Sequence, residues 1–174
     1  MAKEKLSSCG YVELGYGQVE PNHLSAQRNG QIYAQLPMAE TVKVLENGQF
    51  AKYNYADGVV DFDGEGEWML VYNTVKIYGD YETEADYAMK ANGSTAGAVV
   101  GVTTDLVPRL FKTNIGDIFT TNTIKETDVT LGGMLYVGTD GYLTTEVNGT
   151  MKWQVVKKYT LADGQKAVKV MRIA

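Results

Sequence analysis

The chain has 174 residues, 44% of them hydrophobic and 21% charged, which is typical of a folded globular protein with one substantial core or two small ones. Its net charge of −5 disfavours nucleic acid as a partner, because phosphate backbones are bound by clustered cations. The single Cys9 and single His23 exclude an intrachain disulfide and a multi-histidine metal site. Without a long apolar run or a signal-peptide pattern, we expect a soluble chain with no membrane association.

The first 35 residues contain scattered glycines, tyrosines and glutamines, and they follow neither helical nor strand periodicity. Such a segment either folds back over the core or extends as an arm that becomes ordered on a partner. We predict an extended N-terminal arm over residues 1–35.

Turn signals recur along the rest of the chain. Asn-Gly and Asp-Gly are the strongest hairpin dipeptides because both accept positive φ. The chain contains eight of them, at 29–30, 47–48, 57–58, 63–64, 92–93, 140–141, 148–149 and 163–164. Runs rich in Val, Ile, Tyr and Thr lie between them, and these residues favour strands. The expected strands cover 41–45, 49–55, 67–78, 116–123, 134–138, 142–145, 152–160 and 166–173.

These elements predict a mainly β chain with at most one or two short helices. Residues 85–91 have fair helix propensity, and Asn92-Gly93 would end a helix there. The stretch 93–98 is rich in Gly, Ser and Ala, which is typical of a connection. We therefore predict two small β modules of barrel or sandwich type, one over 36–92 and a barrel-like one over 99–174.

Charge is unevenly distributed. Residues 57–86 hold nine acidic residues and one lysine, whereas residues 152–174 hold six basic residues and one aspartate. The two segments either pair within the fold or lie on different faces and guide contacts between copies or with a charged partner. In the basic segment, Trp153, Val155 and Tyr159 alternate with polar residues, which predicts one buried and one exposed strand face, with Lys157 as the exception.

Few residues point to chemistry. Asp61, Asp63 and Glu65 are candidates for calcium ligands, because alternate carboxylates on an extended backbone face one way. The run lacks the full EF-hand spacing, so we expect a solvated acidic loop rather than a calcium site. A catalytic pair of Cys9 and His23 is disfavoured, and no phosphate-binding glycine motif occurs. The twelve tyrosines form either a binding face or part of the sheets. We expect no enzymatic activity, no cofactor and no resident metal.

Three segments resemble small virion structural proteins of tailed bacteriophages, in particular capsid decoration and minor head proteins. They are residues 107–122 (VPRLFKTNIGDIFTTN), 135–144 (LYVGTDGYLT) and 153–173 (WQVVKKYTLADGQKAVKVMRI). Residues 31–37 and 67–72 add a weaker resemblance in the N-terminal half. The matching features are turns and strands rather than catalytic signatures, and Gly138-Thr-Asp-Gly141 departs from the strict pattern.

The resemblance implies a non-enzymatic protein that binds the outer surface of a phage capsid and is assembled into the virion in the host cytoplasm. Its partner would be the major capsid protein, with a homo-oligomer as a further possibility. The capsid-interface candidates are Lys157, Lys158, Lys169, Arg172, Tyr11 and Tyr16. The alternative is a receptor- or glycan-binding module of a head or tail fibre, in which the Tyr-rich and acidic N-terminal half binds the ligand.

Overall fold

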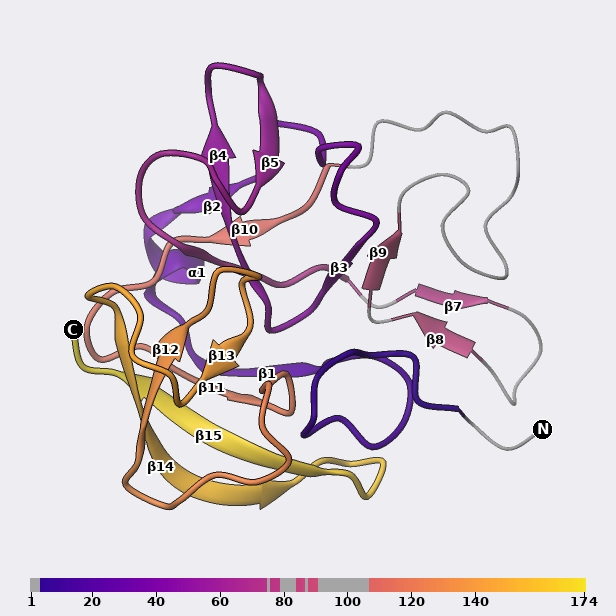
Figure 1. The fold of residues 1–174 in the computed structure, drawn as a ribbon, viewed down its shortest axis with the longest axis vertical. Helices are drawn as coiled ribbons and strands as arrows, with labels where there is room; N and C mark the ends of the chain where they lie inside the picture. The colour runs from indigo at the N-terminus through magenta and orange to yellow at the C-terminus, as the bar shows by residue number, and fades with distance from the viewer. Residues whose placement is uncertain (1–3, 75, 79–83, 87, 91–106) are drawn as a thin grey trace.

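The computed structural model describes residues 4–74, 76–78, 84–86, 88–90 and 107–174. The described chain is mainly β with one short helix, as predicted (Figure 1). In chain order the elements are β1 (Val19–His23), α1 (Ser25–Asn29), β2 (Ile32–Tyr33), β3 (Val44–Glu46), β4 (Phe50–Asn54), β5 (Val59–Asp61), β6 (Met69–Val71), β7 (Lys76–Tyr78), β8 (Glu84–Asp86), β9 (Ala88–Lys90), β10 (Leu110–Phe111), β11 (Ile118–Thr121), β12 (Met134–Val137), β13 (Leu143–Thr144), β14 (Lys152–Thr160) and β15 (Lys166–Arg172).

Two antiparallel sheets organise the fold. The larger has six strands in the order β1-β11-β15-β14-β12-β13, and the smaller has five in the order β2-β10-β6-β4-β5. Each ends in two edge strands, so neither sheet closes into a barrel. Two-stranded pairs join β3 with β9 and β7 with β8. No described helix is long and apolar enough to cross a membrane.

The predicted turn dipeptides connect three hairpins. Asp57-Gly58 joins β4 to β5, Asp140-Gly141 joins β12 to β13, and Asp163-Gly164 joins β14 to β15. Gly164 has a φ of +88°, in the region that side-chain-bearing residues rarely adopt. Three of the seven described dipeptides therefore mark hairpins, whereas Asn29-Gly30 ends α1 and the other three lie in connections between strands that do not pair with each other.

The N-terminal segment is not an extended arm in its described part. β1 forms an edge of the six-stranded sheet by pairing with β11, and Cys9, Tyr11, Val12 and Tyr16 are all buried. The arm prediction is wrong here because the apolar side chains of this segment pack from irregular loop backbone, which leaves no periodic pattern in the sequence. The alternative, in which the segment folds back over the core, is the one observed.

The helix expected over 85–91 is also replaced by strands where the structure describes it. Glu84–Asp86 and Ala88–Lys90 form β8 and β9, and β9 pairs with β3. Tertiary pairing overrides the local helix propensity of this alanine-containing stretch. The predicted connection at 93–98 lies outside the described residues.

The two predicted modules share structure. β10, from the C-terminal half, lies between β2 and β6 in the five-stranded sheet. Phe50 of that sheet packs on Trp153 of the six-stranded sheet, with ring centroids 5.6 Å apart, and both belong to the main core cluster. The described parts of 36–92 and 99–174 therefore share the main core cluster, while a second cluster, which includes Leu45, Tyr53 and Val71, is built from 36–92 together with Leu110.

Candidate interaction surface

One face of the six-stranded sheet carries no member of a core cluster among the described residues. Trp153 and Val155 point to the core side, where they pack with residues of the five-stranded sheet. Neighbouring positions along a strand point to opposite faces and directly paired residues share a face, so the register defines the opposite side. We call it the open face. Its exposed and partly exposed members are Glu20, Ile118, Met134, Tyr136, Lys152, Gln154, Lys157, Tyr159, Lys169 and Met171. Thr120, Thr144 and Ala167 also lie on it and are buried.

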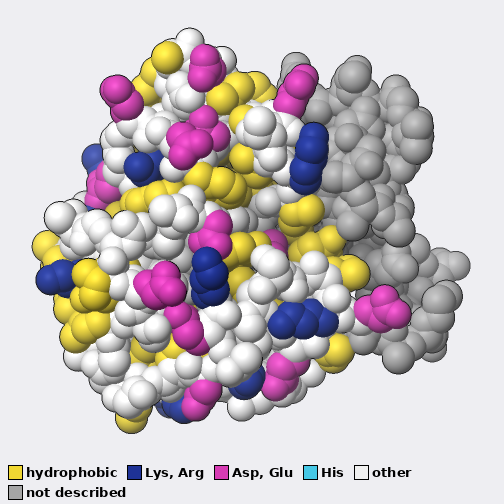
Figure 2. Space-filling view, in the orientation of Figure 1, with side chains coloured by type: hydrophobic (Ala, Val, Ile, Leu, Met, Phe, Trp, Pro, Cys, Tyr) yellow, Lys and Arg dark blue, Asp and Glu magenta, His cyan; other side chains and the backbone are white. Residues whose placement is uncertain are grey.

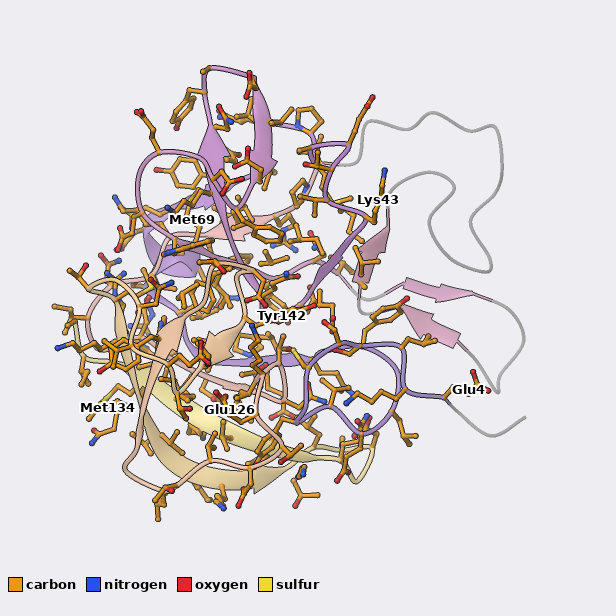
Figure 3. The ribbon with its side chains drawn as sticks, viewed as in Figure 1. Glu4, Lys43, Met69, Glu126, Met134 and Tyr142 are labelled. Carbon is orange, nitrogen blue, oxygen red and sulfur yellow. The ribbon has the colours of Figure 1, made fainter. Side chains whose placement is uncertain are left out.

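The open face mixes apolar and basic side chains. Ile118, Met171, Gln154 and Met134 form one cross-strand row through four neighbouring strands, and none of them belongs to a core cluster of the described chain. Met134 lies at the left edge of the molecule in Figure 3. The three partly exposed apolar side chains of this row, Ile118, Met171 and Met134, lie beside lysines and favour a protein contact surface over a solvated sheet face.

Two of the predicted interface lysines meet on this face. Lys157 lies directly opposite Lys169, because the register between β14 and β15 shifts after Val155. The shift is a bulge, which explains why Lys157 breaks the alternation in the sequence. It also turns Tyr159 onto the open face, opposite Ala167, so the prediction that Tyr159 shares the face of Trp153 is wrong. Lys169 Nζ lies 5.9 Å from the Tyr159 ring centroid.

The other two basic candidates already have partners within the fold. Lys158 Nζ lies 2.9 Å from Asp128 Oδ1. Arg172 is ion-paired with Glu67 and also donates hydrogen bonds to Thr113. The acidic and basic segments of the sequence are thus joined within the fold at Arg172–Glu67, and Lys157 and Lys169 remain without an ion pair in the described structure.

Tyr11 and Tyr16 lie inside the protein rather than on its surface. Their exposed fractions are 2% and 3%. Tyr11 belongs to the main core cluster, and Lys166 Nζ lies 4.8 Å from its ring centroid. Burial, followed by the charge of Asp128, raises the pKa of Tyr11. Because neither ring is accessible, their assignment as interface candidates is not supported by their position.

In the acidic loop that follows β5, the carboxylate of Asp61 stabilises the turn. Asp61 Oδ1 accepts hydrogen bonds from the backbone N–H groups of Asp63 and Gly64, and Asp61 Oδ2 accepts one from Asn54. Asp63 and Glu65 point outward and are exposed. Among the described residues, no group of three His, Cys, Asp or Glu side chains is arranged to hold a metal ion.

A buried carboxylate joins three distant parts of the chain. Glu46 is 1% exposed and accepts hydrogen bonds from Ser7 Oγ at 2.9 Å, Tyr142 OH at 2.7 Å and the Gly17 N–H at 2.7 Å. Tyr142 lies near the middle of the molecule, beside the N-terminal loop (Figure 3). Through these hydrogen bonds Glu46 connects the segment before β1 with Tyr142, next to β13. Glu46 therefore has a structural role that the sequence did not reveal.

Cys9 lies beside this cluster and has the character of an inert thiol. Burial, followed by the charge of Glu46, raises the pKa of Cys9 far above its ordinary value, which keeps the thiol protonated and a poor nucleophile. His23 is exposed at the end of β1, and no hydrogen bond joins these two described residues. The structure thus places the two residues in different surroundings.

A small groove lies between the two sheets. It has a volume of about 240 Å³ and is lined by Lys52, Glu67, Trp68, Asn148 and Arg172 with their neighbours. Lys52 Nζ lies 4.5 Å from the Trp68 ring centroid, so a cation covers the aromatic face. The volume is below the range of about 300–1,000 Å³ usual for small-molecule sites.

Comparison of this chain with known protein families, with characterised proteins and with solved structures finds no match.

Proposed function

We propose that this protein is a non-enzymatic structural protein of a tailed-phage virion that binds the outer surface of the capsid. The virion assignment is supported by the resemblance of residues 107–122, 135–144 and 153–173 to phage decoration and minor head proteins. The physical support is independent of that resemblance, and it comes from how charge is distributed over the molecule.

The observation that carries the proposal is the separation of two contact regions. The open face presents Lys157 and Lys169, which form no ion pair with any described residue, beside apolar side chains. At the other end of the long axis, the β4–β5 hairpin presents exposed carboxylates and Tyr55, which is 73% exposed (Figures 1 and 2). A protein with two complementary contact regions is suited to assembly with other proteins. A capsid decoration protein acts by assembling with other proteins in this way.

The buried ionisable groups fit the same function. Glu46 joins the N-terminal loop to β13, and Asp117 accepts hydrogen bonds from Ser25 and Asn114, which fastens α1 to the start of β11. Each carboxylate holds segments together. We expect a rigid adaptor whose activity lies on its surface.

Co-sedimentation with capsids assembled without this protein tests the proposal. We expect saturable binding of the purified chain, weakened as ionic strength rises, because screening shortens the reach of surface charges. A soluble protein of similar size and net charge is the control. If this protein pellets with capsids no more than the control does, the proposed function is contradicted.

The second candidate function, a glycan-binding module of a fibre, is favoured by one feature, the groove at Trp68. Asn148, Lys52 and Glu67 place hydrogen-bonding groups around the Trp68 ring, and Lys52 would have to move off the ring face before a sugar could stack there. Under this function, Trp68→Ala abolishes binding to host-cell polysaccharide and leaves capsid binding untouched. If the protein binds capsids instead, the wild-type protein does not bind the polysaccharide, and Trp68→Ala has no such binding to abolish.

A further inference from the structure

The lysine pair on the open face needs an acidic partner. Like charges placed directly opposite each other in a sheet destabilise it, and Lys157 and Lys169 occupy directly paired positions. Lys152 adds a third cation on the same face, whereas the acidic residue on this side, Glu20, lies on the edge strand β1. The face therefore favours a ligand that carries several carboxylates.

The chain itself carries a surface of that kind. Residues 53–66, which we call the acidic end, contain four carboxylates and no lysine or arginine. Asp57, Asp63 and Glu65 are exposed and have no ion pair within the described structure. Tyr55 stands among them with 73% of its surface exposed. Figure 2 shows acidic side chains standing out around this end of the molecule.

The acidic end cannot reach the open face of its own molecule. Trp153 faces Phe50 of the five-stranded sheet, so the opposite face of β14 points away from that sheet. The five-stranded sheet carries β4 and β5 and hence the acidic end. In Figure 1 the β4–β5 hairpin and the β14–β15 pair lie at opposite ends of the long axis. Only another copy of the chain can bring the two regions together.

We propose that the open face receives the acidic end of a second copy of this chain, so that copies bind head to tail. The carboxylates of Asp57, Asp63 and Glu65 lie over Lys157 and Lys169, and Tyr55 packs on the neighbouring apolar row. Such a contact joins two different surfaces, so it continues from copy to copy until it closes on itself or ends. This inference rests on the proposed function, since copies bound side by side on a capsid are positioned for repeated contacts.

The contact is small, which sets the expected strength. Four strands at a spacing of about 4.8 Å span about 14 Å from β11 to β12, and the seven residues of β15 span about 23 Å at about 3.3 Å each. The face therefore covers about 330 Å², well short of the roughly 800 Å² per partner of a standard interface. We therefore expect weak association of the free protein at low ionic strength, which salt suppresses over a Debye length of about 8 Å at 0.15 M. On a capsid the same contact is strengthened by high local concentration.

Sedimentation velocity without capsids tests the contact by itself. We expect the average mass of the wild-type chain to rise with protein concentration at low salt and to fall back when salt is added. Two variants separate the surfaces: K157E/K169E reverses the open face, and D57N/D63N/E65Q neutralises the acidic end. Each variant alone stays monomeric, and both melt as the wild type does because the changed side chains are surface-exposed or partly exposed.

Mixing the two variants provides the sharpest outcome. The K157E/K169E chain keeps a working acidic end and the D57N/D63N/E65Q chain keeps a working open face, so the mixture forms a 1:1 dimer and goes no further. The control K5E/R28E makes the same change in net charge at exposed residues away from the open face, and it associates as the wild type does. An equimolar mixture that stays monomeric overturns the inference.

Other results also decide the question. A wild-type chain that stays monomeric at every concentration and salt, or a K157E/K169E chain that associates normally, overturns the head-to-tail contact. If K157E/K169E loses capsid binding but associates as the wild type does, the open face belongs to the capsid contact and the inference fails. If the wild type associates head to tail but never binds capsids, the proposed function fails and the contact stands.

Discussion

Truncating Trp153 is expected to destabilise the whole chain, because this side chain joins the two sheets. Trp153 is 0% exposed, and its ring centroid lies 5.6 Å from that of Phe50 and 5.0 Å from that of Phe119. Replacing a buried aromatic side chain with alanine costs about 3–5 kcal/mol, since the cavity collapses only in part. We expect Trp153→Ala to lower the free energy of unfolding by an amount in this range.

A second substitution at the same position makes the reasoning sharper. Trp153 Nε1 is buried and has no hydrogen-bond partner among the described residues, and an unsatisfied buried donor costs about 1–3 kcal/mol. Trp153→Phe removes that donor and keeps an aromatic ring. The free energy gained by removing the unsatisfied donor therefore offsets part of the cost of the smaller side chain. We expect Trp153→Phe to cost less than about 2 kcal/mol, and hence less than Trp153→Ala.

Urea unfolding measures both variants, followed by far-ultraviolet circular dichroism and by the fluorescence of Trp68, which packs against the same core cluster. Because the main core cluster contains residues of both sheets, the two signals should change together in each variant. A Trp153→Ala chain within about 1 kcal/mol of the wild type would refute the packing argument. A Trp68 transition separated from the circular dichroism transition would refute the shared core.

Three further predictions concern the carboxylates and the N-terminal segment. Glu46→Ala leaves three buried or partly buried donors without an acceptor, so we expect a loss of about 3 kcal/mol in urea unfolding; an unchanged midpoint would argue against the clamp. Burial alone would raise the pKa of Glu126, but hydrogen bonds from Thr144 and Thr145 outweigh it and lower the pKa below 4.5. Its contribution to stability is therefore present above pH 4.5 and lost as the pH falls through the lowered pKa. We expect melting temperatures measured in acid to fall less steeply with pH in Glu126→Gln than in the wild type; an identical acid profile would contradict this. Deleting residues 2–20 removes buried side chains and part of β1, so we expect no cooperative melt; a truncated chain that melts as the full one does would restore the arm hypothesis.

The sequence predicts the hairpins well because their information is local. Asp140-Gly141 and Asp163-Gly164 specify turns by the backbone angles that they allow, whatever the rest of the chain does. The alternation of Trp153 and Val155 with polar residues likewise predicts which way the start of β14 faces. Both features depend on neighbours only a few residues away.

Features that depend on distant contacts could not be predicted from the sequence. Tyr11 and Tyr16 are buried by loops that wrap the body, and no periodicity marks such burial. The bulge in β14 appears only when its register against β15 is known, yet it decides that Lys157 and Tyr159 share the open face. Which of the basic residues lack an ion pair therefore follows from pairing across the sheet and not from composition.

The number of copies bound per capsid at saturation tests the central claim most directly. It can be measured by quantifying this chain in capsids purified after incubation with an excess of it. We expect binding to level off at a fixed number that matches the repeating units of the capsid lattice. Binding that never saturates, or that stops at the few copies taken up by a portal or tail, would contradict the account.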